Sequence, residues 1–162
     1  LTFEDQFERK AGLADLRGAV VVLVYGDRKG TDACRKLGEE LHVAFHPSAK
    51  GLPPAKAQQA PVAPLHSGQL GPDVCVVPVA CCGKVPGPVR GLIRTQIAKA
   101  SPDVVVWLDF QNMMKDTFNL KAGEANLVVF DPTGRPRHTI NGNPTTAVKS
   151  PSIRSMRFPP AP

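Results

Sequence analysis

The sequence lacks several features that would assign a function directly. No apolar run approaches the ~20 residues that a membrane-spanning helix needs, and no G-x-S-x-G, P-loop or G-x-G-x-x-G motif is present. These absences argue against a membrane protein, and against several common hydrolase and nucleotide-binding families. No cofactor is indicated.

Cysteine is scarce. The four cysteines, at positions 34, 75, 81 and 82, have none of the paired C-x-x-C spacings typical of zinc sites. They are also too few to hold together a disulfide-rich small domain. We therefore expect no metal site, and either free thiols or one disulfide with two further thiols.

Aromatic residues are few as well, with one Trp, one Tyr and seven Phe. The net charge is +6, but the Lys and Arg residues are scattered along the chain. Nucleic-acid binding favours a concentrated basic surface and aromatic side chains that stack on bases. We interpret the charge as a mildly basic surface and expect no nucleic-acid partner.

The 162 residues, 42% hydrophobic and 21% charged, are typical of one globular domain. The run AVVVLVY (19–25) is typical of a strand buried on both faces. We expect further strands at 74–80, 103–109, 126–131 and 136–140, and helices at 31–41, 86–100 and 111–120. This alternation predicts an α/β fold with parallel pairing, and the turn DPTGR adds an antiparallel last strand.

Two helices and one strand carry more specific predictions. Thr31 is a favourable N-cap for the helix 31–41. The helix 86–100 has one apolar face, which consists of Val89, Leu92, Ile93 and Ile97. Pro78 argues against a fully paired central position for the strand 74–80.

The segment 47–72 has six prolines and no acidic residue. We expect a surface insertion there, with a short helical turn near 55–60. The predicted domain spans 1–140, followed by an extended C-terminal tail at 141–162.

The order of elements resembles the thioredoxin fold. Three segments resemble its peroxiredoxin and thioredoxin-like branch: LADLRGAVVVLVYGDR, VVVWLDFQNMMKDTFNL and NLVVFDPTGRPRHTI. The resemblance covers residues 3 to 140. It implies a mixed central sheet flanked by helices, with chemistry just after the first buried strand.

The resemblance implies that Cys34 is the reactive residue, because peroxiredoxins have a Thr three residues before theirs and Thr31 matches it. Three departures accompany this match. The sequence has no C-x-x-C motif and no proline upstream of Thr31. It also lacks the cis-proline before the strand 126–131, where Ala125 is expected to be trans.

Cys34 itself allows two interpretations. With Thr31 as N-cap, Cys34 is the third helical residue, where free N–H groups and nearby cations lower a thiol pKa. Alternatively, Cys34, Leu37 and Leu41 form one helical stripe that faces the sheet, and Cys34 is an inert core residue.

Cys81 and Cys82 lie at the end of a predicted strand, at the edge where the helix bearing Cys34 begins. One of them could resolve a disulfide with Cys34, although their side chains point to opposite faces of a continuing strand. Two packed thiols, or a Cys81–Cys82 vicinal disulfide, are the alternatives. Cys75 is expected in the core.

His42 and His46 are four residues apart, a metal-binding spacing only on a helix. Solvent-facing or capping roles are favoured over metal binding. Asp109 and Asp131 each end a predicted strand, where capping is common.

Taken together, the sequence predicts a thiol-based redox protein that reduces peroxide or a disulfide through Cys34, with an unidentified thiol or protein partner. The alternative is a redox-inactive binding module of the same fold. Periplasmic or exported and cytoplasmic locations are both open.

Overall fold

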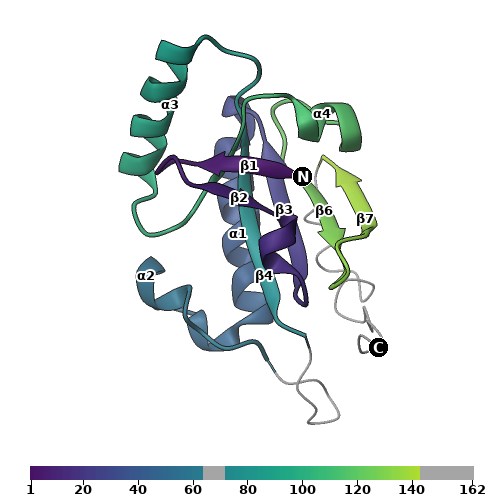
Figure 1. Cartoon of the computed structure of the whole chain (residues 1–162). Helices are drawn as coiled ribbons and strands as arrows, with labels where there is room; N and C mark the ends of the chain where they lie inside the picture. Colours follow the sequence, from purple (N-terminus) through teal and green to yellow (C-terminus); the bar gives the residue numbers. More distant parts are fainter. Residues whose placement is uncertain (64–71, 143–162) are drawn as a thin grey trace.

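The computed structural model describes residues 1–63 and 72–142, in which seven strands form one sheet (Figure 1). In chain order the strands are β1 (Thr2–Asp5), β2 (Lys10–Gly12), β3 (Val20–Gly26), β4 (Val74–Cys81), β5 (Trp107–Asp109), β6 (Asn126–Phe130) and β7 (Pro136–Asn141). Across the sheet the order is β2-β1-β5-β4-β3-β6-β7. β4 pairs in parallel with β3 and β5, and all other pairs are antiparallel. The predicted mixed sheet is therefore confirmed.

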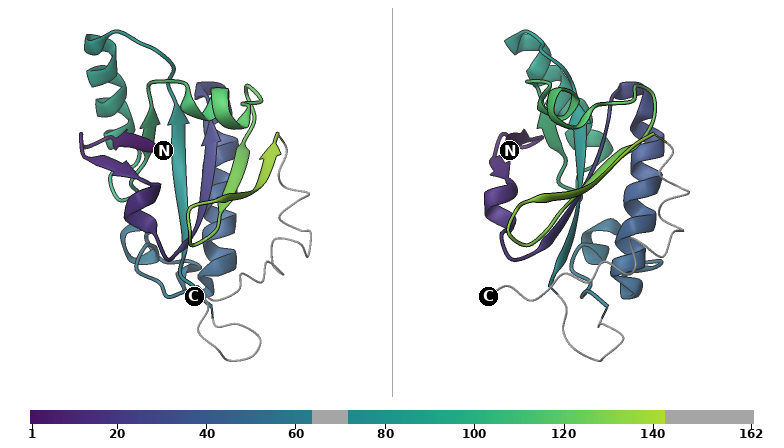
Figure 2. Two further views of the ribbon diagram at one scale, coloured as in Figure 1. Left: turned by 45° about the vertical axis from the view of Figure 1, so that its right-hand side comes forward. Right: turned by 90° about the vertical axis from the view of Figure 1, so that its right-hand side faces the viewer.

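Helices cover both faces of this sheet. They are α1 (Thr31–Phe45), α2 (Pro54–Ala57), α3 (Gly87–Ala100) and α4 (Met113–Phe118), with 3₁₀ turns η1 (Leu13–Leu16), η2 (Arg28–Gly30) and η3 (Pro47–Ala49). α1 lies on one face, and η1 and α4 lie on the other (Figure 2). Each face buries its own apolar cluster.

The strand predicted at 19–25 lies in the middle of the sheet. All seven residues of β3 are buried, between β4 and β6. Leu23 and Tyr25 alternate into the cluster beneath α4, while Val22 and Val24 face the cluster beneath α1. Because both faces are covered, the strand needs apolar side chains at every position.

The strand predicted at 103–109 is shorter than expected, because β5 contains only its last three residues. The side chain of buried Gln6 bonds to the preceding segment instead. Its amide donates to Val104 O (2.8 Å) and accepts from Val106 N (2.8 Å). The N-terminal hairpin of β1 and β2 pairs through β1 with the other edge of β5.

Pro78 lies within β4 without interrupting the pairing with β3. Val20 N donates to Asp73 O (2.8 Å), and the parallel register pairs Val24 with Pro78. In a parallel pair, the N–H groups of successive residues point alternately toward the partner strand and away from it. Position 78 is one of those that point away from β3, so the N–H that proline lacks is not needed for this pairing. β5 pairs with β4 only from Val79 onward, so the absent donor falls on an open edge.

The predicted helix 86–100 is present as α3, but its apolar face does not pack on the sheet. Val89 and Leu92 are 40% and 59% exposed. Arg90 and Arg94 instead lie over the ring of Phe110, 5.2 Å and 5.5 Å from its centroid. Cation–π contacts thus attach α3 to the domain.

Within the predicted insertion 47–72, the structure describes residues 47–63, which form η3 and α2. α2 confirms the expected helical turn near 55–60. Residues 64–71 and most of the predicted tail, 143–162, lie outside the described part of the chain, so the domain boundaries stay predictions.

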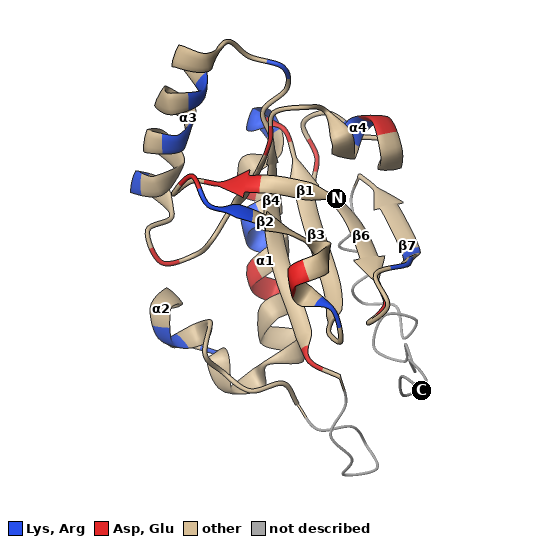
Figure 3. Ribbon diagram, viewed as in Figure 1, with Lys and Arg blue, Asp and Glu red and all other residues tan. Residues whose placement is uncertain are grey.

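Charged residues are distributed over several elements (Figure 3). Lys and Arg appear on α1, α2, α3 and β2, with acidic residues on β1, η1 and α4. In the part that the structure describes, no helix is long and apolar enough to cross a membrane.

Candidate functional site

The ends of the paired strands β3 and β4 and the start of α1 carry three cysteines, and Figure 1 shows how these elements are arranged. β3 ends at Gly26 and β4 ends at Cys81, followed by Cys82, while Cys34 lies at the start of α1. We call Cys34, Cys81 and Cys82 the cysteine edge. Cys75 lies near the beginning of β4, away from this group.

The start of α1 differs from the prediction. Gly30 is the N-cap and Thr31 is already the first helical residue, so Cys34 is the fourth rather than the third. The Thr31 hydroxyl donates to Arg28 O (3.0 Å). The capping acceptor is Asp27, whose carboxylate receives the N–H groups of Lys29 and Gly30 at 3.0 Å. Thr31 therefore fixes the backbone of η2 rather than the thiol of Cys34.

Cys34 packs inward, against the cluster beneath α1. Its sulfur lies directly over Gly26: a Cβ built on that glycine would be 2.5 Å from Sγ and 3.2 Å from Glu124 O. The thiol is therefore half-buried between the end of β3 and the loop before β6. This position is compatible with both interpretations of Cys34, as an inert core residue and as a reactive thiol, because both place the thiol inward at the end of a strand.

The expected lowering of the Cys34 pKa is wrong. Burial raises the pKa of Cys34 to about 11; a hydrogen bond from the backbone N–H of Asn126 lowers it, and the negative charge of Asp27 raises it further. The predicted cationic surroundings are absent at the sulfur, since Arg35 pairs with Asp32 (2.9 Å) on the exposed side of α1. Desolvation of the thiolate outweighs the favourable helix start.

The other two thiols of the cysteine edge are also protonated at neutral pH. Burial raises the pKa of Cys82 to about 11, with a contribution from Asp109. The pKa of Cys81 is raised further, first by burial and then by negative charge at Asp109, Cys82 and Cys34. Cys81 and Cys34 thus lie within electrostatic reach of each other. All four cysteines are free thiols.

Cys81 and Cys82 differ in their surroundings. Cys81 packs against the cluster beneath α4, while the Cys82 thiol donates to Ala80 O (3.4 Å). The predicted opposite orientation of these neighbouring side chains fits their different contacts. Among residues 1–63 and 72–142, no group of three His, Cys, Asp or Glu side chains could hold a metal ion.

Sequence analysis missed two residues that shape the site. Besides capping η2, Asp27 receives Gly123 N on both carboxylate oxygens (3.1 Å each). Asn126 is fully buried, and its amide donates to Glu124 O (3.1 Å) and Lys121 O (3.2 Å). Together they hold the loop 119–125 against the start of α1. The spacing of Asp27 to the N–H groups two and three residues later, typical of an Asx turn, was the available signal.

The same loop occupies the position where the resemblance calls for a cis-proline. No peptide bond in the described ranges is cis, so Ala125 is trans as expected. The loop approaches closely because Gly30 has no side chain: a Cβ there would lie 2.7 Å from Glu124 O. This contact narrows access to Cys34 from the loop side.

The acids that end strands have the capping roles predicted for them. The Asp109 carboxylate accepts from the backbone N–H groups of Gln111, Met113 and Met114 at 2.9–3.0 Å, which fixes the start of α4. The Asp131 carboxylate organises the turn between β6 and β7.

No protein-family model matches the sequence, and no curated protein matches it. Solved structures share its fold. An exposed lipoprotein thioredoxin from Streptococcus pneumoniae is 14% identical, with a TM-score of 0.55 over 88% of this chain and 89% of that one. A secreted thiol-disulfide isomerase from Corynebacterium glutamicum is 14% identical, with a TM-score of 0.54 over 91% and 78%. A protein assigned as a thiol-disulfide oxidoreductase from Bacteroides vulgatus is 14% identical, with a TM-score of 0.58 over 96% and 87%. The chain has a thioredoxin-like fold, as predicted.

Proposed function

We propose that this protein is a thiol redox protein that reduces a disulfide of a thiol compound or a protein through Cys34. The observation that carries the proposal is the cysteine edge, where three of the four thiols meet at the ends of β3 and β4. In an open α/β sheet this edge is where ligands bind. The fold shared with thiol-disulfide oxidoreductases and a thioredoxin supports the same chemistry.

The proposed reaction needs two thiols and a substrate disulfide. The Cys34 thiolate attacks one sulfur of the substrate, which forms a mixed disulfide and releases the first substrate thiol. A second cysteine then attacks Cys34 Sγ and releases the second substrate thiol. The substrate gains two electrons and two protons, and the protein is left with one disulfide.

We assign the second thiol to Cys81, with Cys82 as the alternative. A negative charge on Cys34, once its thiol is deprotonated, would raise the pKa of Cys81, which indicates that the two sulfurs lie near each other. Gly26 adds no side chain at the end of β3, so the Cys34 sulfur reaches the strand ends directly. A Cys34–Cys81 bond requires Cys81 to turn out of its packing beneath α4.

Attack on a peroxide and attack on a disulfide both need the thiolate, and Cys34 with a pKa of about 11 is almost entirely a thiol at neutral pH, so both reactions are slow there. The preference for disulfide reduction rests on the redox potential of the thiol pair instead. A low thiol pKa stabilises the reduced form and makes a couple oxidising, as in strongly oxidising exchange proteins. Thiols with raised pKa values lack that stabilisation, which makes their disulfide a weaker oxidant.

The test is turnover of a disulfide substrate by the purified full chain. We expect the protein to accelerate the reduction of insulin disulfides by dithiothreitol above the uncatalysed rate, and Cys34→Ser to return the rate to the uncatalysed one. Cys75→Ser is the matched control, because Cys75 lies outside the cysteine edge, and it should retain activity. Cys81→Ser should stop the reaction at the mixed disulfide, and a block in Cys82→Ser instead would reassign the second thiol.

A redox-inactive binding module is the second candidate. It is favoured by the raised pKa of all four thiols and by the trans bond at Ala125. Its binding surface would be formed by residues 26–34, 80–84 and 123–126. If the wild-type protein, reduced or oxidised beforehand, turns over neither several disulfides nor hydrogen peroxide, the binding module is the correct function.

Location bears on the same choice. Disulfide chemistry is typical of oxidising compartments, and two of the solved neighbours are an exposed lipoprotein and a secreted isomerase. We therefore propose a periplasmic or exported location over a cytoplasmic one. Cell fractionation with antibody detection tests it, and recovery of the protein with cytoplasmic markers would contradict it.

A further inference from the structure

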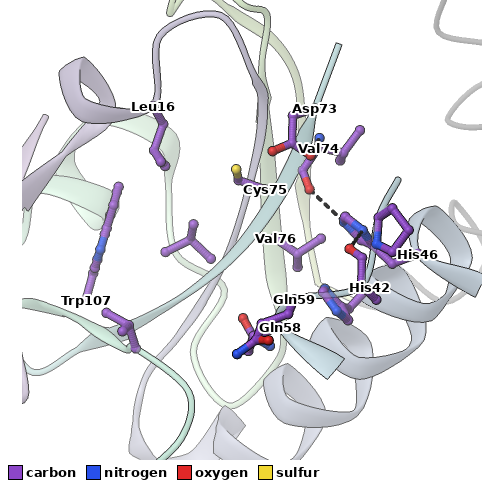
Figure 4. Close-up of a pocket in the computed structure, with 14 residues that line it drawn as sticks. Leu16, His42, His46, Gln58, Gln59, Asp73, Val74, Cys75, Val76 and Trp107 are labelled. Carbon is purple, nitrogen blue, oxygen red and sulfur yellow. Dashed lines mark hydrogen bonds between the residues drawn. The ribbon is translucent and has the colours of Figure 1, made fainter. Parts of the chain in front are cut away.

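A half-open cavity of about 520 Å³ lies at the opposite end of β4 from the cysteine edge (Figure 4). Residues 57–63, which we call the strap, form one of its walls, and α1 and β4 form the others. Its lining includes Val76 and Trp107, together with Gln58 and Gln59 of the strap. The cavity is distinct from the proposed thiol site.

Two histidines attach the strap, His42 in α1 and His46 directly after it. His42 Nε2 lies 2.8 Å from Ala57 O, and His46 Nδ1 lies 2.8 Å from Ala60 O. The third hydrogen bond between the strap and α1, within the described ranges, runs from Ala63 N to Phe45 O (2.8 Å). Two of three attachments therefore depend on imidazole rings.

His46 makes a second contact that restricts its protonation state. It is only 5% exposed, and its Nε2 lies 2.9 Å from Val74 O on β4. Figure 4 shows the ring directed at Val74. Carbonyl oxygens only accept, and a neutral imidazole has only one N–H. Both His46 contacts are hydrogen bonds only if both of its nitrogens carry protons.

The groups around His46 are compatible with one positive charge. From α1, the ring of His42 stacks on it with centroids 4.5 Å apart, and one contact of His42, Nε2 to Ala57 O, needs a proton on one nitrogen alone. From the β4 side, the titratable groups that line the cavity are Asp73 and Cys75. The strap and η3 contribute none. Asp73 is the acidic residue at that end of β4, and its exposed carboxylate accepts from Val74 N (2.9 Å).

We propose that His46 is a proton-controlled latch, which joins the strap to β4 as an imidazolium and releases one of the two when it loses a proton. Release frees the strap wall and widens the cavity along the open edge of β4. The proton goes to solvent, and no other reactant is needed. The latch is independent of the proposed thiol chemistry, because its residues and those of the cysteine edge lie at opposite ends of β4.

The test follows the ring and the strap in the full-length protein between pH 5 and 8, the range in which imidazoles titrate. Long-range ¹H–¹⁵N correlation spectra should show both His46 nitrogens protonated at the lower pH and one protonated at the higher pH. Hydrogen exchange of the Ala63 amide, corrected for its intrinsic pH dependence, should accelerate about tenfold over the same range, because a charged hydrogen bond is lost.

Two variants assign the effect. His46→Gln should remove the pH dependence of Ala63 exchange, whereas His42→Gln, which removes the stacked neighbour, should retain it. A single neutral His46 tautomer throughout the range would overturn the proposal, as would pH-independent exchange of Ala63 in the wild type. The proposal would also be overturned if the exchange of Ala63 still depended on pH in His46→Gln. If His46→Gln does not fold, the wild-type ring spectra and exchange decide alone.

Discussion

Replacing Gly26 with alanine tests the contact that defines the surroundings of Cys34. The added Cβ would lie 2.5 Å from Cys34 Sγ and 3.2 Å from Glu124 O. A carbon–sulfur approach below 3 Å forces α1 or the loop 119–125 to move, because the sulfur is held on a helix and the oxygen on a backbone. Overpacking of this kind costs about 1–3 kcal/mol. For a chain of this length, each kcal/mol lowers the Tm by about 2–4 °C.

The assay is urea unfolding followed by far-UV circular dichroism. Combining the change with Cys34→Ala, which deletes the sulfur, should recover part of the lost stability, with a coupling of about 1 kcal/mol or more between the two sites. Some loss should remain, because Glu124 O still lies 3.2 Å from the new carbon. Gly38→Ala is the matched control, since a Cβ at Gly38 meets nothing within 4 Å. Alanine there should raise the free energy of unfolding by about 0.5–1 kcal/mol.

Two outcomes would refute the reasoning about Cys34. If Gly26→Ala is as stable as the wild type, the sulfur does not lie over the end of β3. If the effects of Gly26→Ala and Cys34→Ala simply add, the cost comes from the loop at Glu124 and the thiol has room to move.

Two further predictions concern buried polar groups. Hydrogen bonds, first that of the Thr133 hydroxyl, hold the pKa of Asp131 well below its usual range, so its carboxylate stabilises the fold above about pH 4 and this stabilisation is lost as the pH falls. Asp131→Asn should lower the free energy of unfolding at pH 7 and make it fall less steeply between pH 5 and 2, as measured by urea unfolding at each pH. The same fall in the variant and the wild type over this range would contradict the prediction. Asn126→Ala should lower the free energy of unfolding by about 1–3 kcal/mol, because it removes the side-chain donor of Glu124 O and one of the two donors of Lys121 O. Thermal unfolding measures this loss, and a Tm equal to that of the wild type would be the contrary result.

The arrangement of the sheet could be predicted because its strands carry strong local patterns. The run 19–25 has no charged side chain and is rich in β-branched residues, as is typical of a strand covered on both faces. The turn at Asp131 and Gly134 likewise predicted the antiparallel pairing of β6 and β7. These features depend on residues close together in the sequence.

The remaining features depend on contacts between distant residues. β5 is short because Gln6, about one hundred positions away, bonds to the segment before it. The apolar face of α3 stays exposed because Phe110 and two arginines fix the helix elsewhere. Periodicity predicts that a face is apolar, but it cannot predict which surface is available to cover it.

The environment of Cys34 combines both kinds of information. Its place at a helix start could be predicted and favours a thiolate. Its burial between Gly26 and the loop at Glu124 could not, because Gly26 and Glu124 are brought together only by the fold. The second effect is the larger, so the sign of the predicted pKa shift was wrong.

Asp27 offers a way to change the Cys34 pKa without touching the thiol. Its negative charge raises that pKa after burial has done so, and asparagine keeps a hydrogen-bond acceptor for Gly30 N. Asp27→Asn should therefore lower the pKa of Cys34 and accelerate its alkylation by iodoacetamide at a given pH. Peptide-level mass spectrometry from pH 7 to 10 measures this for each cysteine separately. Asp32→Asn is the control, because Asp32 is exposed and pairs with Arg35.

The same substitution could act by loosening the loop, since Asp27 also receives Gly123 N on both oxygens. The two causes separate in the hydrogen exchange of the Gly123 amide. If charge is responsible, alkylation of Cys34 accelerates while Gly123 stays protected. If the loop opens, Gly123 exchanges faster, and the pKa of Cys34 falls as well because its burial is relieved, so the exchange of Gly123 tells the two causes apart. Equal acceleration in Asp27→Asn and Asp32→Asn would show that the charge beside the thiol has no specific role, and that burial alone sets the reactivity of Cys34.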